Sequence, residues 1–307
     1  MTDDTTPRTV HARRMLTLGT VAATLAVPAA ATTGAPQVSD TPPSISQQAG
    51  NSNSIVLAEG EGEGEGEASA AIKADGKGLF AAGSEQGEGE GEGEGGGGGD
   101  PTVTFLRDLG FMTGHLRAGM ALYAQGDLEA ARTHMGHPIK EKYEAVAGPL
   151  EKLGFSGLRA DIVALSNAAE AGADVADIQA RFDHVIEEVG EVRAATPAGA
   201  RDRLMALAAL TRIAAEEYTV AVEGGTVSNL HEYQDAWGFV RTVEAEATRF
   251  ANSDDPAVAK AGARIVEQVG VADAAFGDLQ GAGDFRMDPS LLFAAAARME
   301  LAALEVK

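Results

Sequence analysis

Residues 111–144, FMTGHLRAGMALYAQGDLEAARTHMGHPIKEKYE, decide the fold of this chain. Near the middle of this stretch, Gly126 suits the left-handed residue that closes one helix, and Asp127 suits the N-cap of the next. The stretch therefore predicts a helical hairpin that turns at about residue 126.

Three of the six histidines of the chain lie in this hairpin. His115 precedes Gly126 by eleven residues and His137 follows it by eleven, so an antiparallel hairpin places the two at the same level. His134 and Glu141 lie three residues before and four residues after His137, on the same helical face. Imidazoles together with a carboxylate suit iron or another first-row transition metal ion such as zinc, copper or nickel. The hairpin therefore predicts a metal site.

Pro138 complicates this prediction, because proline is best tolerated in the first turn of a helix. We expect the second helix to kink or to restart here, which would make His137 resemble an N-cap and would loosen its pairing with Glu141. Two other interpretations stay open. The pattern also resembles one hairpin of a helical repeat, in which small residues pack the helices, and it could offer a surface for a partner protein.

From Pro101 onward the sequence predicts an all-α fold. Apolar residues recur at intervals of three and four, and Ala, Leu, Glu and Arg dominate. We expect an antiparallel bundle of about seven or eight helices over 101–307, with a possible subdivision near Thr196-Pro197. The expected helices lie near 102–124, 127–150, 157–171, 174–195, 198–223, 229–252, 256–275 and 288–305. Four of their starts follow cap or cap-plus-proline signals at Asp174, Thr196, Asp255 and Asp288.

Residues 1–35 have the pattern of an export signal. Arg13-Arg14 precede a short apolar run that ends in Pro28-Ala-Ala-Ala31. The run is too short for a comfortable membrane span, so we expect cleavage near residues 31–35 and no membrane insertion of the mature chain. Arg-Arg-Met-Leu resembles the twin-arginine signal, which exports folded proteins. The predicted location is the periplasm.

Residues 36–100 predict a disordered acidic linker. Glu and Gly alternate in two runs, Glu59–Glu67 and Gly87–Gly99. Such a segment cannot bury apolar surface, and glycine loses much entropy on ordering. The interpretation is a solvated spacer, although a tail that collects cations weakly is an alternative.

Composition excludes several functions. The chain has no cysteine, which excludes disulfides, thiolate metal sites and covalent haem attachment. Its formal net charge of -22 argues against nucleic-acid binding. No nucleophile, phosphate-binding or dinucleotide motif is present, so we do not expect an enzyme.

His184 and Glu187 form a second, shorter ligand pattern. The two residues lie three apart and share a helix face. Carboxylate and histidine side chains on facing helices build metal sites in bundles. We therefore add both residues to the predicted ligands, with an exposed or capping pair as the alternative.

The stretch EEYTVAVEGGTVSNLHEYQDAWGFV, residues 216–240, contains a helix, a Gly224-Gly225 turn and a second helix. The turn brings two Glu-Tyr pairs and His231 to similar depth. This pattern resembles the soluble helical domain attached to high-affinity iron permeases, and the resemblance implies an exported relative that works beside such a transporter. Alternatively, Glu217, Tyr218, Glu232 and Tyr233 are interhelical hydrogen-bond partners around a core Trp237.

Taken together, these patterns predict an exported periplasmic metal-binding protein, an accessory in iron uptake or handling. Its expected partners are the metal ion and an inner-membrane iron transporter or a periplasmic redox protein. Two alternatives remain open: a helical protein–protein interaction module without metal, and a non-covalent haem protein that uses His115 or His137.

Overall fold

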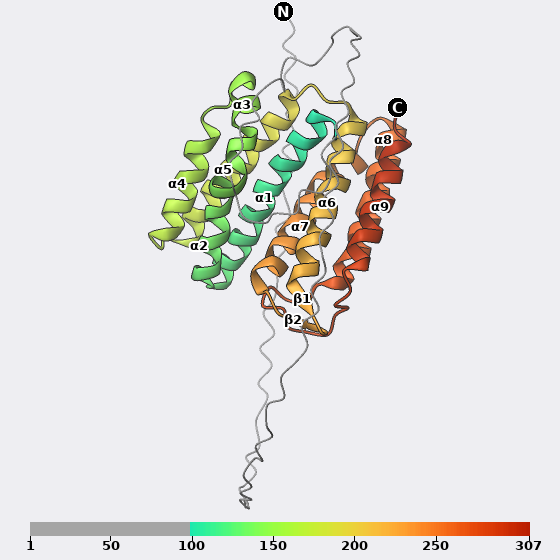
Figure 1. Ribbon diagram of the computed structural model, residues 1–307. Helices are drawn as coiled ribbons and strands as arrows, with labels where there is room; N and C mark the ends of the chain where they lie inside the picture. The colour runs from blue at the N-terminus through green and yellow to red at the C-terminus, as the bar shows by residue number, and fades with distance from the viewer. Residues whose placement is uncertain (1–98) are drawn as a thin grey trace, which may run out of the picture. The chain divides into compact units, whose positions relative to one another are not determined.

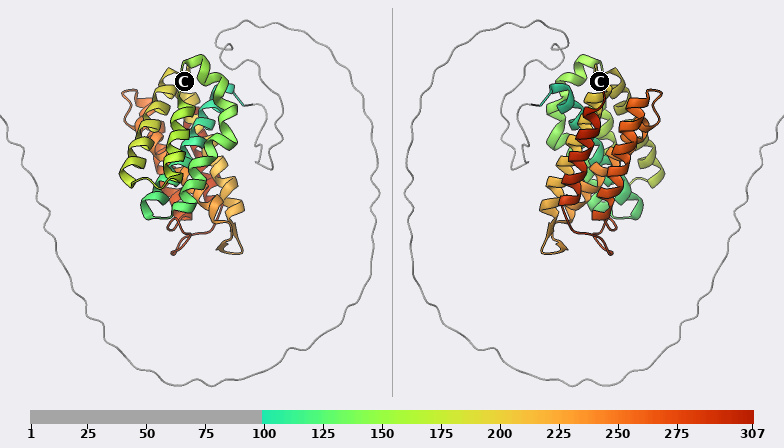
Figure 2. Two further views of the ribbon diagram at one scale, coloured as in Figure 1. Left: turned by 90° about the vertical axis from the view of Figure 1, so that its left-hand side faces the viewer. Right: turned by 90° about the vertical axis from the view of Figure 1, so that its right-hand side faces the viewer.

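The computed structural model describes residues 99–307, which form an all-α bundle and so confirm the predicted fold class. The predicted export signal and the predicted linker up to residue 98 lie outside the described residues. Within the described range the α-helices are α1 Pro101–Gln125, α2 Leu128–His137, α3 Tyr143–Leu153, α4 Leu158–Glu170, α5 Val175–Ala195, α6 Ala200–Ala221, α7 Leu230–Ala251, α8 Pro256–Ala272 and α9 Ser290–Leu304. The long helices run along one common direction (Figures 1 and 2).

The hairpin of α1 and α2 turns where the sequence predicted. Gly126 adopts a left-handed conformation with φ 85°, and its N–H donates to carbonyl oxygens of the last turn of α1. The Asp127 side chain accepts a hydrogen bond from the backbone N–H of Ala130 and so caps α2. A glycine closes one helix and an aspartate opens the next, which fixes α1 and α2 side by side.

Pro138 widens the helix and does not break it. Residues Pro138–Lys142 form a π-helical turn that joins α2 to α3, and the N–H of Tyr143 donates to the carbonyl of Pro138. His137 remains helical, with φ -60° and ψ -43°, so the expectation that it would be an N-cap is wrong. Its Nδ1 lies 3.1 Å from Oε1 of Glu141. A π-helical turn contains one residue more than an α-helical turn, and this wider turn accommodates Pro138. The side chains of His137 and Glu141 stay close to each other.

Two other local expectations need correction. Thr196 does not open a helix, because its hydroxyl donates to the carbonyl of Val192 at the end of α5. Helix α6 begins at Ala200, where Asp202 reaches back to the N–H of Gly199. The Gly224-Gly225 turn joins two short antiparallel strands, β1 Val222–Glu223 and β2 Thr226–Val227. Both glycines have positive φ, 60° and 78°, as a tight hairpin turn requires.

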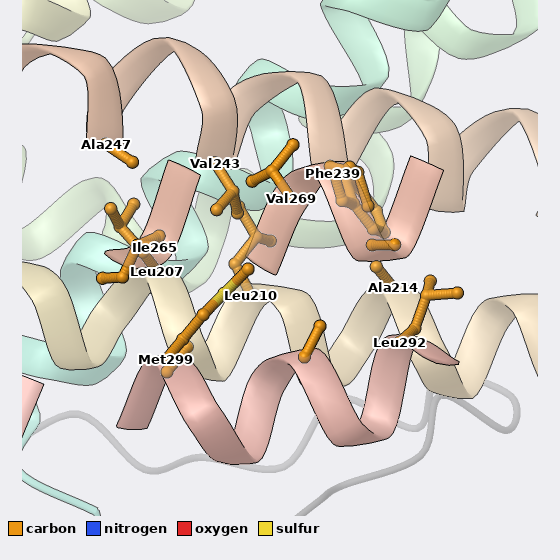
Figure 3. Packing of buried hydrophobic residues seen from close by; sticks show 14 of the residues in the cluster. Leu207, Leu210, Ala214, Phe239, Val243, Ala247, Ile265, Val269, Leu292 and Met299 are labelled. Atoms are coloured by element: carbon orange, nitrogen blue, oxygen red, sulfur yellow. The ribbon is translucent and has the colours of Figure 1, made fainter. Parts of the chain in front are cut away.

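The apolar side chains form two cores. The N-terminal core is built mainly by α1 to α5, with Ala206 of α6 and Leu279 added to it, and the C-terminal core is built mainly by α6 to α9. Figure 3 shows the C-terminal core, where Leu207 and Leu210 of α6 face Val243 of α7 and Met299 of α9. In Figure 1, α1 lies between the two groups of helices, and its Phe111 belongs to the C-terminal core. Helices α1 and α7 thus join the two halves of the bundle.

A 3-10 turn, Asp273–Ala275, leads from α8 into the segment before α9. Two buried tyrosines anchor this segment: the hydroxyl of Tyr218 donates to the carbonyl of Ala275, and the hydroxyl of Tyr233 accepts from the N–H of Gly277. Both tyrosine hydroxyls therefore bond to the backbone of this segment, and not between two facing helices as the alternative interpretation of this stretch expected. None of the helices within residues 99–307 combines the length and the hydropathy that a membrane span requires.

Candidate metal centre

The three histidines of the hairpin lie close together. The ring centroid of His115 lies 5.1 Å from that of His137 and 6.3 Å from that of His134. The carboxylate of Glu141 joins them, with Oε2 3.5 Å from Nε2 of His115. Helix α1 thus supplies one imidazole, α2 supplies two, and the π-helical turn supplies the carboxylate. The level arrangement expected from the hairpin is present.

Helix α7 adds a fourth histidine and a buried aspartate. The ring of His231 stacks on that of His134 at 4.4 Å and lies 4.6 Å from that of His137. Four residues further along α7, Asp235 is 3% exposed and points into the cluster. Its Oδ1 lies 2.5 Å from Nδ1 of His115, and its Oδ2 lies 3.4 Å from Nδ1 of His231. We call His115, His134, His137, His231 and Asp235 the histidine cluster.

His134 is fully engaged by its neighbours. Its Nδ1 lies 2.8 Å from Oδ1 of Asp235, and its Nε2 lies 2.9 Å from Oε1 of Gln234. The amide of Gln234 is oriented by its own NH₂ group, which donates to the carbonyl of Leu279. Nε2 of His134 must therefore donate to Oε1 of Gln234, because that oxygen can only accept. His134 is held on both sides, as a positioning residue would be.

The other three histidines line a cavity of about 50 Å³, together with four acidic side chains, Glu141, Glu217, Glu232 and Asp235. Two of these histidines carry a buried ring nitrogen that makes no hydrogen bond within residues 99–307, namely Nε2 of His115 and Nε2 of His231. Their neighbours differ: Nδ1 of His115 lies 2.5 Å from Oδ1 of Asp235, and Nδ1 of His137 lies 3.1 Å from Oε1 of Glu141. Buried polar atoms are normally hydrogen-bonded, so such a group of exceptions needs an explanation.

The electrostatics favour neutral imidazoles in the cavity. Burial, reinforced by the neighbouring imidazole of His115, lowers the pKa of His137 to about 3. Burial also lowers the pKa of His231. For Asp235, burial alone would raise the pKa, but His115 and His134 bring it well below its usual range. At neutral pH the cavity therefore offers an ionised carboxylate at Asp235 and neutral imidazoles at His137 and His231, the forms that bind metal ions.

His134 has the opposite tendency. Burial alone would lower its pKa, but the hydrogen bond and charge of Asp235, with help from Gln234, raise it. Asp235 thus favours the charged form of His134, which lies outside the cavity, whereas burial disfavours the charged forms of His137 and His231.

Sequence reasoning missed Asp235 and did not count His231 among the ligands. The available signal was the i, i+4 spacing of these two residues in His-Glu-Tyr-Gln-Asp, which places both on one face of α7. The expected equal depth of the two Glu-Tyr pairs is correct, since Glu217 and Glu232 line the same cavity.

The second predicted pair lies outside the histidine cluster. The side chain of His184 on α5 is 63% exposed, and its Nε2 lies 3.9 Å from Oδ2 of Asp161. The carboxylate that completes this surface group belongs to Glu188, and Glu187 is exposed beside it. Burial and the neighbouring Asp161 raise the pKa of Glu188. The structure does not bring His184 or Glu187 to the other predicted ligands.

Residues 193–278 match the family model of the iron permease-associated 4-helix bundle domain. No match was found among curated proteins or among solved structures. The matched segment includes Glu217, His231 and Asp235, whereas the histidines of α1 and α2 precede it. The match confirms the resemblance seen in residues 216–240 and associates this part of the chain with iron permease function.

Proposed function

We propose that this protein is an exported, periplasmic metal-binding protein and that its histidine cluster holds iron as cargo for an uptake system. The expected ligands are His115, His137 and His231 with the carboxylate of Glu141. Asp235 and His134 position them. This assignment keeps three predicted ligands, moves His134 to a supporting role and adds His231 from α7.

The unpartnered nitrogens of the cavity carry this proposal. Of the three histidines that line the cavity, His115 and His231 each have a buried Nε2 that makes no hydrogen bond in the described part of the chain, and Nδ1 of His137 faces the carboxylate of Glu141. His134, which does not line it, has both nitrogens occupied. Leaving a buried polar atom unsatisfied costs about 1–3 kcal/mol, so two such nitrogens beside carboxylates around one small cavity support a bound cation.

The charge and chemistry of the lining agree with a first-row ion. Imidazole nitrogen and carboxylate oxygen are ligands that iron shares with its neighbours in the series. The four lining carboxylates give the cavity a negative potential that attracts cations. The match to an iron permease-associated domain supports iron among these ions.

Exposure of the lining supports a cargo that exchanges. The side chain of His115 is only 2% exposed, whereas those of Glu141 and His231 are 28% and 32% exposed. An ion can therefore reach the buried nitrogens past two partly exposed ligands. A porphyrin does not fit a cavity of about 50 Å³, because small-molecule sites of about 300–1,000 Å³ are needed for ligands of that size.

The proposed setting follows from the sequence. Arg13-Arg14 and the apolar run after them support export, and the acidic linker supports a spacer between the signal and the bundle. The expected partner that receives the ion is an inner-membrane iron transporter or a periplasmic redox protein.

The test begins with elemental analysis of the full mature protein purified without an affinity tag. Melting is then followed with added Fe²⁺ under anaerobic conditions and with Zn²⁺, Cu²⁺, Ni²⁺ and Mn²⁺. Ion binding should raise stability by about 2.7 kcal/mol when the free ion is a hundredfold above its Kd. A His115→Ala, His137→Ala double variant should lose the ion-dependent rise.

Two further variants serve as controls. His184→Ala removes a histidine on the surface of α5 and should keep the full ion-dependent rise. His134→Gln should melt at a lower temperature without metal and still respond to the ion. If no first-row ion stabilises the wild-type protein, or if His184→Ala loses the response as completely as the double variant, the metal proposal is wrong. An interaction module without metal then takes its place.

A further inference from the structure

A second cavity lies along the faces of α1 and α7 that point away from the histidine cluster. It has a volume of about 570 Å³ and lies between α1, α5 and α7. Arg117 follows His115 by two residues and Trp237 follows Asp235 by two, which places each about 200° around its helix from the cluster. The volume falls within the range of about 300–1,000 Å³ that is typical of small-molecule sites.

The walls of this cavity pair arginines with aromatic rings. The guanidinium carbon of Arg117 lies 6.0 Å from the ring centroid of Phe182, and that of Arg241 lies 5.8 Å from the ring of Trp237. Met120 and three alanines add apolar surface to the lining, and Gln179, Glu244 and Thr248 add polar groups. A flat apolar ligand with a negative charge would complement such a surface.

Arg241 already has its counter-ions. Its Nη1 lies 2.7 Å from Glu244, which also lines the cavity, and its Nη2 pairs with Asp273. These contacts neutralise Arg241 and fix it against Trp237. Glu244 is likewise compensated, so it does not set the charge of the cavity.

Arg117 is the uncompensated cation of the lining. It forms no ion pair within residues 99–307, and its buried Nε has no hydrogen-bond partner there. The nearby carboxylate of Glu246 is shared with two other guanidinium groups, since Arg193 lies 4.0 Å and Arg249 lies 3.5 Å from it. Burial, offset only partly by Glu246, lowers the pKa of Arg117. An anion bound beside Arg117 would balance this excess of positive charge.

We propose that this cavity binds a small aromatic carboxylate, with its carboxylate on Arg117 and its ring against Trp237 and Phe182. Arginine binds carboxylates through two parallel hydrogen bonds, and the unsatisfied Nε provides one of the donors. The site is separate from the histidine cluster, so it stands or falls independently of the metal proposal.

Trp237 is the only tryptophan of the chain, so its emission reports on this cavity directly. Benzoate is the probe, titrated into the full mature protein with excitation at the red edge of tryptophan absorption. A one-ring ligand should saturate the signal below about 10 mM, given the affinity that so few atoms provide. Acetate, which lacks the ring, and benzyl alcohol, which lacks the charge, should each bind at least tenfold more weakly. Calorimetric titration repeats the comparison without relying on emission.

Arg117→Met keeps an apolar stem against Phe182 and removes the charge, so it should weaken benzoate at least tenfold while benzyl alcohol is unchanged. Arg181→Met is the matched control, because Arg181 lies on the exposed side of α5 and pairs with Asp177. It should bind benzoate as the wild type does. The proposal is overturned by any of three results: no saturable benzoate binding, equal binding of benzoate and benzyl alcohol by the wild type, or equal loss in both arginine variants. The comparison of probes on the wild type decides the matter even if Arg117→Met does not fold.

Discussion

Gly238 of α7 lies directly against Gly114 of α1, and a Cβ atom at position 238 would overlap the carbonyl oxygen of Gly114. The two helices can therefore approach only because neither residue has a side chain at the crossing. His115 follows Gly114 directly, and the close approach brings its Nδ1 to 2.5 Å from Oδ1 of Asp235 on the facing helix. The contact between two backbones thus sets the geometry of the histidine cluster.

Gly238→Ala should separate α1 from α7 and disturb the cluster. We expect a loss of about 1–3 kcal/mol in the free energy of unfolding, as for overpacked cores, together with loss of the ion-dependent rise in melting temperature. Urea unfolding and ion titrations measure both. Gly270→Ala on α8 is the control, because no atom lies within 4 Å of a Cβ there. It should stabilise the helix by about 0.5–1 kcal/mol and leave ion binding intact. Equal behaviour of the two variants would contradict this account.

Asp235→Asn should destabilise the metal-free protein more than any change at the rim of the cavity. The carboxylate of Asp235 compensates His134 and contacts His115, so its loss leaves buried imidazoles without a counter-charge. Because the folded pKa of Asp235 is lowered, its contribution is present above the unfolded value of about 3.9 and is fully present at pH 7. We expect a loss of about 3–5 kcal/mol by urea unfolding. Glu232→Gln, in the same cavity, should cost less than half as much, and similar losses in both variants would argue against the central role of Asp235.

His137 should make the metal-free protein sensitive to acid. Its pKa is about 3 in the folded chain and about 6.5 when unfolded. Between these values the unfolded chain binds a proton that the folded chain does not, so the free energy of unfolding falls as the pH falls below 6.5. The free energy of unfolding can fall by at most about 1.4 kcal/mol per pH unit through this one group, and partial solvation of the side chain makes the fall smaller.

The measurement compares urea unfolding of wild-type protein and His137→Gln at pH 7.5, 6.0 and 5.0 in the presence of a chelator. The variant should lose less stability on acidification than the wild type. His184→Gln removes an exposed histidine and should follow the wild-type curve. Parallel curves for wild type and His137→Gln would refute the assignment of a buried neutral imidazole.

The export signal predicts a specific mature terminus. Pro28-Ala-Ala-Ala31 and Gly34-Ala35 supply small residues after the apolar run, so the mature chain should begin near residues 32–36. N-terminal sequencing of protein from the cell envelope checks this. Replacing Arg13-Arg14 with two lysines should reduce export strongly if the twin-arginine route is used. Recovery of the intact N-terminus from the envelope fraction would contradict export.

The sequence predicted the helices well because their boundaries are local. Gly126, Asp127 and the Asp255-Pro256 pair act on the backbone within a few residues, and each lies at a helix boundary in the structure. Thr196-Pro197 was wrongly predicted to open a helix. Threonine can also end a helix by donating its hydroxyl to the carbonyl of the preceding turn, as Thr196 does here. The π-helical turn could not be derived, because a proline after His137 is compatible with either a break or a bulge.

The sequence predicted only some of the residues of the site. His115 and His137 lie at the same level because they are equally far from the turn of one hairpin, and the sequence shows this spacing directly. Their contact with Asp235 depends on how far α7 slides along α1, and the packing at Gly114 and Gly238 sets that register. No local pattern contains this information, and for this reason Asp235 was missed while its neighbours on the hairpin were found.

The two cores meet at the histidine cluster, and this position has a consequence for cooperativity. His115 and His137 belong to helices of the N-terminal core, whereas His231 belongs to a helix of the C-terminal core. Opening either core separates these three residues from one another, so an ion bound to all of them loses ligands when either core opens. Unfolding of one half then releases the ion and removes the stabilisation of the other half. In that case the ion is released when the two cores unfold together, and the ion-bound protein melts as one unit.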